Sequence, residues 1–210
     1  MRALDRRRCV SILLAVAVLP GWCLAARRRD SRDEWQQRDR VVADLGLKNG
    51  SRIADIGCGR GYFTFHLARA VGEKGKVFAT EISSKALKTV SDRVKKEDLA
   101  NIEPVVSDPT DTKLATDSLD AAFICNVYHH VPKDQRAALS KDIVRAIKPG
   151  GFLFIVDWRM DAKSKHDIGR RIPRDDLVKL AKDAGLTLDA EFYYLQHQVY
   201  LRCRKPDKPK

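Results

Sequence analysis

The sequence lacks the features that mark several specialised classes of protein. Five of its 210 residues are cysteines, and no two of them have the C-x-x-C spacing of a zinc or redox site. It has no internal repeat and no low-complexity block, so a collagen-like chain is excluded. Its apolar stretch, residues 10–26, is seventeen residues long, which is marginal for a membrane-spanning helix of roughly twenty. A polytopic membrane protein is therefore excluded too.

Acidic residues are also in short supply: 40 Lys and Arg face 28 Asp and Glu, for a formal net charge of +12. Such a surplus can indicate nucleic-acid binding, because Lys and Arg neutralise phosphates. Most of the surplus, however, lies at the two ends. Residues 1–40 carry ten basic and five acidic side chains, and residues 201–210 carry five and one, which leaves +3 for residues 41–200. Because the body is nearly balanced, we expect no nucleic-acid partner.

The N-terminal segment has the layout of a targeting signal. A basic stretch precedes residues 10–26, which carry no charge and include a helix-breaking Pro-Gly pair. Ala25 and Ala26 are small enough for cleavage by a signal peptidase. We predict a signal peptide or N-terminal membrane anchor over residues 1–26, and hence an exported, periplasmic or membrane-anchored protein. A cytoplasmic location is the alternative, and membrane contact is expected only through this segment.

The body alternates short apolar strands with amphipathic helices. The predicted strands are residues 52–56, 76–81, 102–107, 119–125 and 152–157, and the predicted helices are 32–46, 63–70, 84–99, 133–147 and 174–184. Residues 186–203 suit an antiparallel hairpin, and residues 205–210 are predicted to form a frayed basic tail. This alternation specifies a mostly parallel sheet covered on both faces, a three-layer α/β sandwich. Ligands of such a sheet bind at the carboxyl ends of its strands.

A glycine-rich turn follows the first predicted strand. Gly57, Gly59 and Gly61 leave room for a ligand to touch the backbone, and they permit positive φ. A dinucleotide fingerprint, G-x-G-x-x-G, would instead require glycine at position 62, which is tyrosine. Asp55 precedes the turn, where it would repel a pyrophosphate but attract an ammonium group, directly or through water. Both features disfavour a nicotinamide-linked oxidoreductase, while a tight turn without any ligand stays open.

Acidic residues also mark the ends of the next two strands. Glu81 ends the second strand, twenty residues beyond Gly61, where a carboxylate can accept from both hydroxyls of a ribose. Asp108 follows the third strand and can accept from an adenine amino group. The alternatives are an ordinary surface acid for Glu81 and an Asx turn before Pro109 for Asp108. Together the three strand ends fit S-adenosylmethionine, which has an adenosine, an amine and a sulfonium.

The motifs ADIGCGRG, LDAAFICNVYHHV and IKPGGFLFIVD, with Glu81 and Asp108, resemble those of class I S-adenosylmethionine-dependent methyltransferases. Within that class the sequence is most similar to the bacterial type-11, ubiquinone-biosynthesis-like group, over about residues 35–204. The resemblance implies a methyltransferase domain over residues 27–204, with a Rossmann-like seven-stranded sheet of order 3-2-1-4-5-7-6 whose last strand is antiparallel. It implies S-adenosylmethionine as the cofactor. The residues it assigns to cofactor binding are Asp55, Gly57, Cys58, Gly59, Gly61, Glu81, Ile82, Asp108 and Asn126.

The segment after the fourth strand is where the methyl group should be transferred. It begins with Asn126 but continues Val-Tyr-His, unlike the Asp/Asn-Pro-Pro-Tyr/Phe motif typical of enzymes that methylate adenine N6 or glutamine. His129 or His130 is a candidate general base, since an imidazole can take a proton near neutral pH. Alternatively, one histidine packs and bonds to the backbone while the other faces solvent. A further basic cluster, Arg170 with Arg171 and Arg174, either holds an acidic substrate group or is a solvated loop.

We therefore predict an enzyme that transfers a methyl group from S-adenosylmethionine to a small-molecule acceptor. The alternatives are a cofactor-binding module without turnover, an NAD-linked oxidoreductase and an RNA methyltransferase. No metal is predicted, because no His, Cys or carboxylate cluster has metal-ligand spacing.

Overall fold

The computed structural model describes residues 31–163 and 168–208. The predicted leader, residues 1–26, lies outside this described part. In chain order the described elements, with η for 3₁₀ helices, are α1 (Ser31–Gln36), α2 (Arg38–Asp44), β1 (Arg52–Ile56), α3 (Thr64–Val71), β2 (Lys76–Glu81), α4 (Ser84–Lys96), β3 (Ile102–Val106), β4 (Leu119–Cys125), η1 (Tyr128–His130), α5 (Arg136–Ala146), β5 (Ile147–Trp158), η2 (Ile168–Arg170), α6 (Arg174–Asp183), β6 (Thr187–Glu191) and β7 (Gln198–Arg204).

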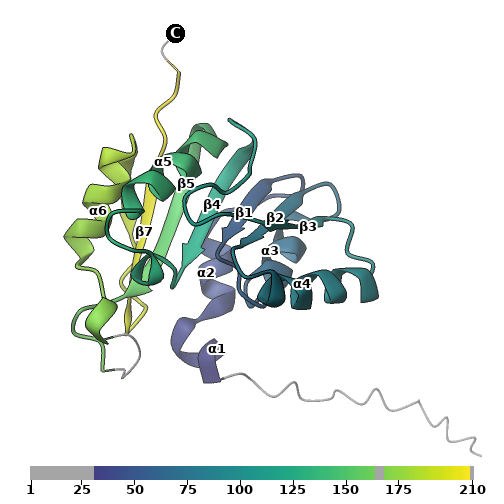
Figure 1. The fold of residues 1–210 in the computed structure, drawn as a ribbon, viewed down its shortest axis with the longest axis horizontal. Coiled ribbons are helices and arrows are strands. Elements are labelled where there is room, and N and C mark those ends of the chain that lie inside the picture. Colours follow the sequence, from purple (N-terminus) through teal and green to yellow (C-terminus); the bar gives the residue numbers. More distant parts are fainter. Residues whose placement is uncertain (1–30, 164–167, 209–210) are drawn as a thin grey trace, which may run out of the picture.

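The seven strands form one sheet in the order β3-β2-β1-β4-β5-β7-β6 (Figure 1). Strands β1 to β5 run parallel to one another, and β7 runs antiparallel to both β5 and β6. This is the predicted strand order with the predicted antiparallel last strand, so the fold class is confirmed. The chain reverses its direction across the sheet between β1 and β4, and the loops that follow these two strands meet at one edge. In open α/β sheets this switch point is where ligands bind.

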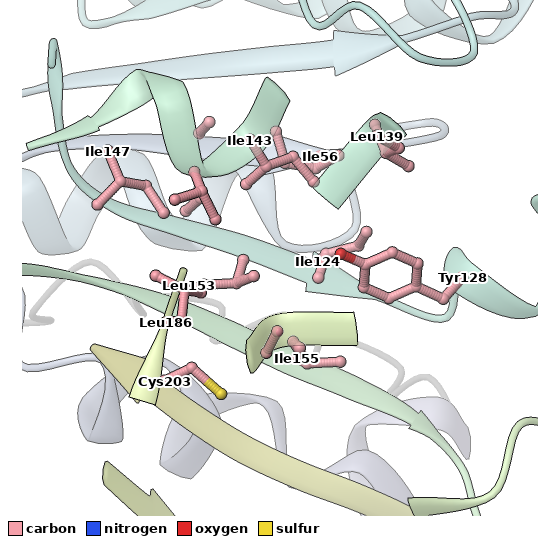
Figure 2. Close-up of a cluster of buried hydrophobic side chains, with 14 of the residues drawn as sticks. Ile56, Ile124, Tyr128, Leu139, Ile143, Ile147, Leu153, Ile155, Leu186 and Cys203 are labelled. Atoms are coloured by element: carbon pink, nitrogen blue, oxygen red, sulfur yellow. The ribbon is translucent and has the colours of Figure 1, made fainter. Parts of the chain in front are cut away.

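Two apolar layers hold the helices against the sheet. On one face, α5 and α6 pack over β4 and β5; Figure 2 shows this cluster, with Ile124, Tyr128, Ile143, Leu153 and Ile155 among its members. On the other face, side chains of α2, α3 and α4 pack against the sheet. Full burial of each large aliphatic side chain contributes about 1.5–3 kcal/mol to the free energy of folding, which stabilises the packing of the helices on both faces of the sheet.

The N-terminal helix is broken, contrary to the single helix predicted over residues 32–46. Gln37 takes a left-handed conformation with φ of 45°, which separates α1 from α2. Its side-chain amide donates to the carbonyl of Tyr194, 3.0 Å away. This contact joins the break between the helices to the segment before β7, and α1 lies beside the carboxyl edge of the sheet (Figure 1).

Strand β5 begins five residues earlier than predicted. The Pro-Gly-Gly sequence at 149–151, between the predicted helix and the predicted strand, lies inside β5 as an irregular stretch opposite the start of β4. The backbone of Gly150 and Gly151 is hydrogen-bonded to the backbone of Lys205. The strand is therefore extended by the returning C-terminal segment, which the local sequence does not reveal.

The start of the C-terminal tail is docked rather than frayed, so that prediction is wrong for Lys205. Its ammonium group donates to the carbonyls of Val144 and Ile147 and to the carboxylate of Asp117, at 2.6–3.0 Å. Three acceptors satisfy the three donors of a lysine. Lys205 thus closes the C-terminal end of α5.

The described residues include no helix that is both long and apolar enough to cross a membrane.

Candidate active site at the carboxyl edge of the sheet

A cavity of about 650 Å³ opens at the carboxyl edge, bounded by the segments that follow β1, β2, β3 and β4. Seven of the residues predicted to form the site line it: Gly57, Gly59, Glu81, Ile82, Asp108, Asn126 and His130. Four others do not line it: Asp55, Cys58, Gly61 and His129. The four successive strand ends therefore converge on one cavity, with the remaining predicted residues behind or beside its wall.

The glycine turn after β1 needs glycine for different reasons at different positions. Gly57 and Gly59 have φ of 66° and 57°, in the left-handed region. A Cβ at Gly57 would also lie 2.5 Å from a methyl carbon of Val127, whereas one at Gly59 would meet nothing within 4 Å. Gly57 is thus where the turn after β1 touches the segment after β4, and a side chain there would push the two apart.

We expect Gly57→Ala to lower the free energy of unfolding by about 3 kcal/mol, combining left-handed strain with overpacking against Val127. Gly59→Ala is the matched control, because it adds the strain alone and should cost about 1 kcal/mol. Urea unfolding of the two variants measures the difference. Equal losses would show that the contact between Gly57 and Val127 does not constrain the site.

Glu81 is locked in place at the end of β2. One carboxylate oxygen accepts from the backbone N–H of Gly59 and the other from that of Ser83, each at 2.9 Å. A carboxylate has about four acceptor positions, so two remain for a ligand. The bond to Gly59 ties the glycine turn to the neighbouring strand, and it orients the carboxylate toward the cavity that both residues line.

Asp55 lies under the glycine turn and is 3% exposed. Its carboxylate accepts from the hydroxyl of Thr64 at 2.6 Å. Burial raises the pKa of Asp55 from the ordinary 3.8 to about 6; the Thr64 hydrogen bond and the charge of Arg32 oppose the rise, and Glu81 adds to it. Burial disfavours the charged form of this carboxylate, so a cation bound nearby would stabilise the charge.

The raised pKa of Asp55 gives a stability prediction with a definite sign. Between about pH 4 and pH 6 the folded protein keeps a proton that the unfolded chain has released, so the stability from the neutral carboxyl is present at low pH and is lost as the pH rises through 6. Asp55→Asn stays neutral and can still accept from Thr64. We expect it to exceed the unsubstituted protein in stability by about 2–3 kcal/mol at pH 8 and to match it near pH 4. Urea unfolding at both pH values checks this, and a variant less stable at pH 8 would contradict it.

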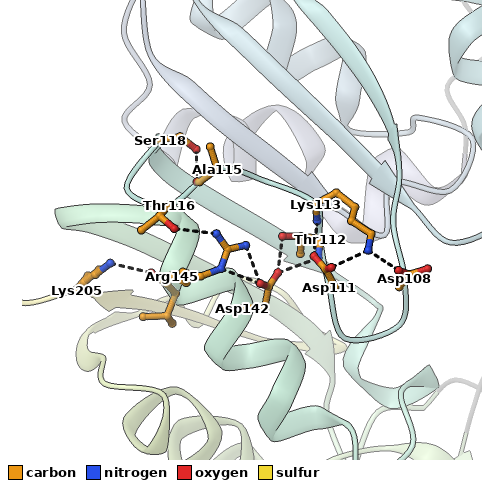
Figure 3. A network of polar contacts seen from close by, with 11 residues as sticks. Asp108, Asp111, Thr112, Lys113, Ala115, Thr116, Ser118, Asp142, Arg145 and Lys205 are labelled. Carbon is orange, nitrogen blue, oxygen red and sulfur yellow. Dashed lines mark hydrogen bonds and ion pairs between the residues drawn. The ribbon is translucent and has the colours of Figure 1, made fainter.

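Asp108 reaches the cavity from the loop after β3, but its carboxylate already has a partner. Lys113 bridges Asp108 and Asp111, with distances of 2.6 and 2.7 Å, as Figure 3 shows. The backbone of Asp108 is hydrogen-bonded to that of Asp111 as an isolated bridge, which fixes the loop. Because exposed ion pairs are worth at most about 1 kcal/mol, an amino group of a ligand can compete with Lys113.

The loop that carries Asp108 is anchored from behind by Asp142 on α5. This carboxylate accepts from the backbone and hydroxyl of Thr112 and pairs with Arg145 (Figure 3). Thr112 is itself part of the cavity wall. The loop that carries Asp108 is therefore held both by Lys113 and by Asp142, which fixes this part of the cavity wall.

The two histidines after β4 differ in environment. His129 is buried, and its Nδ1 lies 2.6 Å from a carboxylate oxygen of Asp157 at the end of β5. His130 is exposed and lines the cavity, and its Nδ1 lies 3.3 Å from the guanidinium of Arg170. Since an arginine can only donate, His130 Nδ1 is the acceptor and the neutral ring carries its proton on Nε2. Of the pair, only His130 is placed to meet a ligand in this cavity.

The basic cluster near α6 is largely engaged within the protein. Arg174 pairs with Glu191 and Asp175, both at 2.7 Å. Arg171 is buried, and its guanidinium donates to the carbonyl of Ala162 at 2.8 Å. Arg170 is exposed and lies next to the cavity-lining His130, whereas Arg171 is buried. The three arginines therefore do not form one site for an acidic group.

Sequence reasoning missed the contribution of α1. Gln36 is fully buried, and Trp35 stacks on Trp158 with ring centroids 5.1 Å apart. Asp33 accepts from the hydroxyl of Tyr62 at 2.6 Å, next to the glycine turn. These partners lie from 29 to more than 100 positions along the chain, and nothing in the local pattern of α1 marks them.

The three cysteines of the described residues are not reactive thiols. Burial raises the pKa of the thiols of Cys125 and Cys203 to about 12, and it raises that of Cys58 as well, so all three are protonated at neutral pH. A thiol in that state is a poor nucleophile. Within residues 31–163 and 168–208, no group of three or more His, Cys, Asp or Glu side chains is arranged to hold a metal ion.

Comparison with known proteins agrees with this geometry. The sequence profile of the family described as "Methyltransferase domain" matches residues 53–151. Demethylmenaquinone methyltransferases are 31% identical over 120 residues, which is 57% of this chain; the match covers 50% of the protein from Staphylococcus saprophyticus and 48% of one from Staphylococcus aureus. The chain thus spans about half the length of the curated relatives it matches.

Solved structures share the whole fold. A SAM-dependent methyltransferase from Aquifex aeolicus superposes with a TM-score of 0.76 at 22% identity, covering 83% of this chain and 93% of that one. The 1,6-didemethyltoxoflavin-N1-methyltransferase from Burkholderia thailandensis, solved with 1,6-didemethyltoxoflavin and S-adenosylhomocysteine, has a TM-score of 0.66 at 17% identity, covering 84% and 80%. At these identities the likeness extends to the fold alone.

Proposed function

We propose that the chain is a class I methyltransferase related to the type-11 group, and that it transfers a methyl group from S-adenosylmethionine to a small-molecule acceptor. The observation that carries the proposal is the placement of Glu81, whose carboxylate is fixed by Gly59 and Ser83 at the wall of the cavity. A fixed carboxylate at the end of the second strand suits the two hydroxyls of a ribose.

The order of the residues around the cavity supports a position for each part of the cofactor. The loop after β3, with Asp108, would hold the adenine, and Glu81 would hold the ribose. Gly57 and Gly59 line the cavity without side chains, so a ligand can approach the backbone of the turn. Asp55, buried behind the turn, would stabilise the positive charge of the amino-acid portion directly or through water.

The bound cofactor supplies a methyl group already activated on a sulfonium, so the protein needs mainly to position the acceptor and exclude water. His130 lies at the cavity, and its proton sits on Nε2 when Nδ1 accepts from Arg170. We assign it a hydrogen-bonding role toward the acceptor rather than removal of a proton. His129, whose Nδ1 is held by Asp157, supports the segment from behind.

The acceptor is proposed to be a small molecule. The relatives at 31% identity are named for demethylmenaquinone, and one structural neighbour holds 1,6-didemethyltoxoflavin. Both names describe small molecules, which makes demethylmenaquinone, also in its reduced form, and 1,6-didemethyltoxoflavin the first acceptors to test. The near balance of charge over residues 41–200 gives no support to an RNA substrate.

The test is to incubate the full chain with methyl-labelled S-adenosylmethionine and each acceptor, then with a fractionated small-molecule extract. Expected products are S-adenosylhomocysteine and a labelled small molecule in equal amounts. Cofactor binding without S-adenosylhomocysteine from any fraction would instead identify a binding module. Label that appears only in RNA would contradict the small-molecule assignment.

We further propose that residues 1–26 act as an export signal or membrane anchor preceding the methyltransferase domain of residues 27–204. The support is the basic stretch followed by an uncharged apolar run. Cell fractionation with sequencing of the mature N-terminus tests this. A soluble cytosolic protein that retains residue 1 would contradict it.

A further inference from the structure

Three buried or half-buried amide side chains form a hydrogen-bonded chain that ends at the cavity. Gln36 on α1 donates to the side-chain oxygen of Gln198 on β7 at 3.0 Å. Gln198 in turn donates to the side-chain oxygen of Asn126 at 2.6 Å. Gln36 and Gln198 are at most 2% exposed, while Asn126 lines the cavity. The chain links α1, the antiparallel strand β7 and the end of β4.

The direction of this amide chain is set at its buried end. Arg32 donates to the side-chain oxygen of Gln36, and an arginine has no acceptor. The Gln36 nitrogen, which also lies 2.9 Å from the sulfur of Cys125, must therefore donate to Gln198. Because the oxygen of Gln198 accepts from Gln36, its nitrogen donates to the oxygen of Asn126. The oxygen of Asn126 thus points toward Gln198, and the amide N–H groups are the donors that Asn126 can offer a ligand.

The order of the strands indicates which part of a ligand Asn126 would meet. Along β3-β2-β1-β4, the cavity residues are Asp108, Glu81, the glycine turn and then Asn126. With adenine at the first and ribose at the second, the amino-acid portion of the cofactor falls at β1 and β4. Its oxygen acceptors are those of the carboxylate, and an amide N–H is a suitable donor to them.

Resting on the proposed function, we propose that Gln36 and Gln198 are positioning residues that hold Asn126 as a hydrogen-bond donor to the carboxylate of the bound cofactor. Neither glutamine lines the cavity itself. Reversing the direction of the chain should then present the Asn126 oxygen to that carboxylate, replacing attraction by repulsion without changing the shape of the site.

Gln198→Glu and Gln36→Glu should each reverse the direction of the hydrogen bonds in the amide chain at pH 8.5, because an ionised carboxylate accepts but does not donate. Asn126→Asp produces the same outcome directly, at a more exposed position. Two probes measured by calorimetry separate the effects: S-adenosylhomocysteine, which has the amino-acid portion, and 5′-methylthioadenosine, which lacks it. We expect all three variants to bind S-adenosylhomocysteine about 10- to 100-fold more weakly, the range for a hydrogen bond to a charged group, with unchanged affinity for 5′-methylthioadenosine.

Equal loss of both probes would show that the amide chain serves only the structure, and it would overturn the proposal. So would unchanged binding of S-adenosylhomocysteine by the three variants. Retained binding of 5′-methylthioadenosine also reports that each variant is folded. Failure of the proposed cofactor site is distinguishable, because the unsubstituted protein would then bind neither probe.

Discussion

Replacing Glu81 with alanine is expected to weaken the binding of S-adenosylmethionine by at least 100-fold. A hydrogen bond from a hydroxyl to a charged carboxylate is worth about 1.5–3 kcal/mol, and a ribose offers two. The substitution also releases the backbone N–H of Gly59, so the glycine turn loses its tie to β2. Both effects act on the same ligand and in the same direction.

Titration calorimetry with S-adenosylmethionine measures the loss. Glu81→Gln should weaken binding less than alanine, since it keeps one acceptor oxygen but turns a donor toward Gly59 or Ser83. Glu103→Ala is the matched control, because Glu103 is an exposed acid on the neighbouring strand β3, paired only loosely with Lys76 at 3.5 Å. If the Glu81 and Glu103 alanine variants bound the cofactor equally well, the ribose assignment would be wrong.

Replacing Asp157 with alanine is expected to cause the largest loss of stability. Its carboxylate accepts from the ring and the backbone N–H of His129 and from the backbone N–H of Trp158, at 2.6–3.3 Å. The side chains of Asp157 and His129 are both 1% exposed, so water cannot replace the lost acceptor. Removing one partner of such a buried pair costs about 3–5 kcal/mol, which lowers the Tm of a chain this size by roughly 6–20 °C.

Thermal unfolding followed by circular dichroism tests this prediction. Asp157→Asn should fall between the alanine variant and the unsubstituted protein, because one of its two oxygens is kept. Asp161→Ala is the control: it removes an exposed carboxylate, 69% accessible, that pairs with Arg159. A Tm loss for Asp157→Ala no greater than that for Asp161→Ala would mean that the pair with His129 does not hold the segment after β4.

The sheet could be predicted because its signals are local. β4 reads LDAAFIC, an apolar run that suits a strand buried on both faces, and its predicted bounds match the structure. The same holds for β1 and β2, where glycines and polar turns punctuate each strand. The start of β5 was predicted wrongly, because Pro149 and Gly150 are turn residues by local rules, and the strand there depends on distant Lys205.

The sequence predicted those parts of the site in which the residue type at the end of a single strand indicates what that residue can bind. Glu81 and the glycine turn meet that condition, and the structure places them at one cavity. The tie of Lys113 to Asp108 and the pairing of His129 with Asp157 could not be predicted from strand ends. The amide chain was hidden for the same reason, since Gln36 and Gln198 are 162 positions apart and each is an ordinary polar residue in its own element.

The central claim is that the cavity between β1, β2 and β4 binds S-adenosylmethionine rather than a dinucleotide. Calorimetric titration of the full chain with S-adenosylmethionine and, separately, with NAD tests it most directly. We predict one binding site per chain for S-adenosylmethionine, lost in Glu81→Ala, and no heat of binding with NAD. Binding of NAD without binding of S-adenosylmethionine would contradict the account.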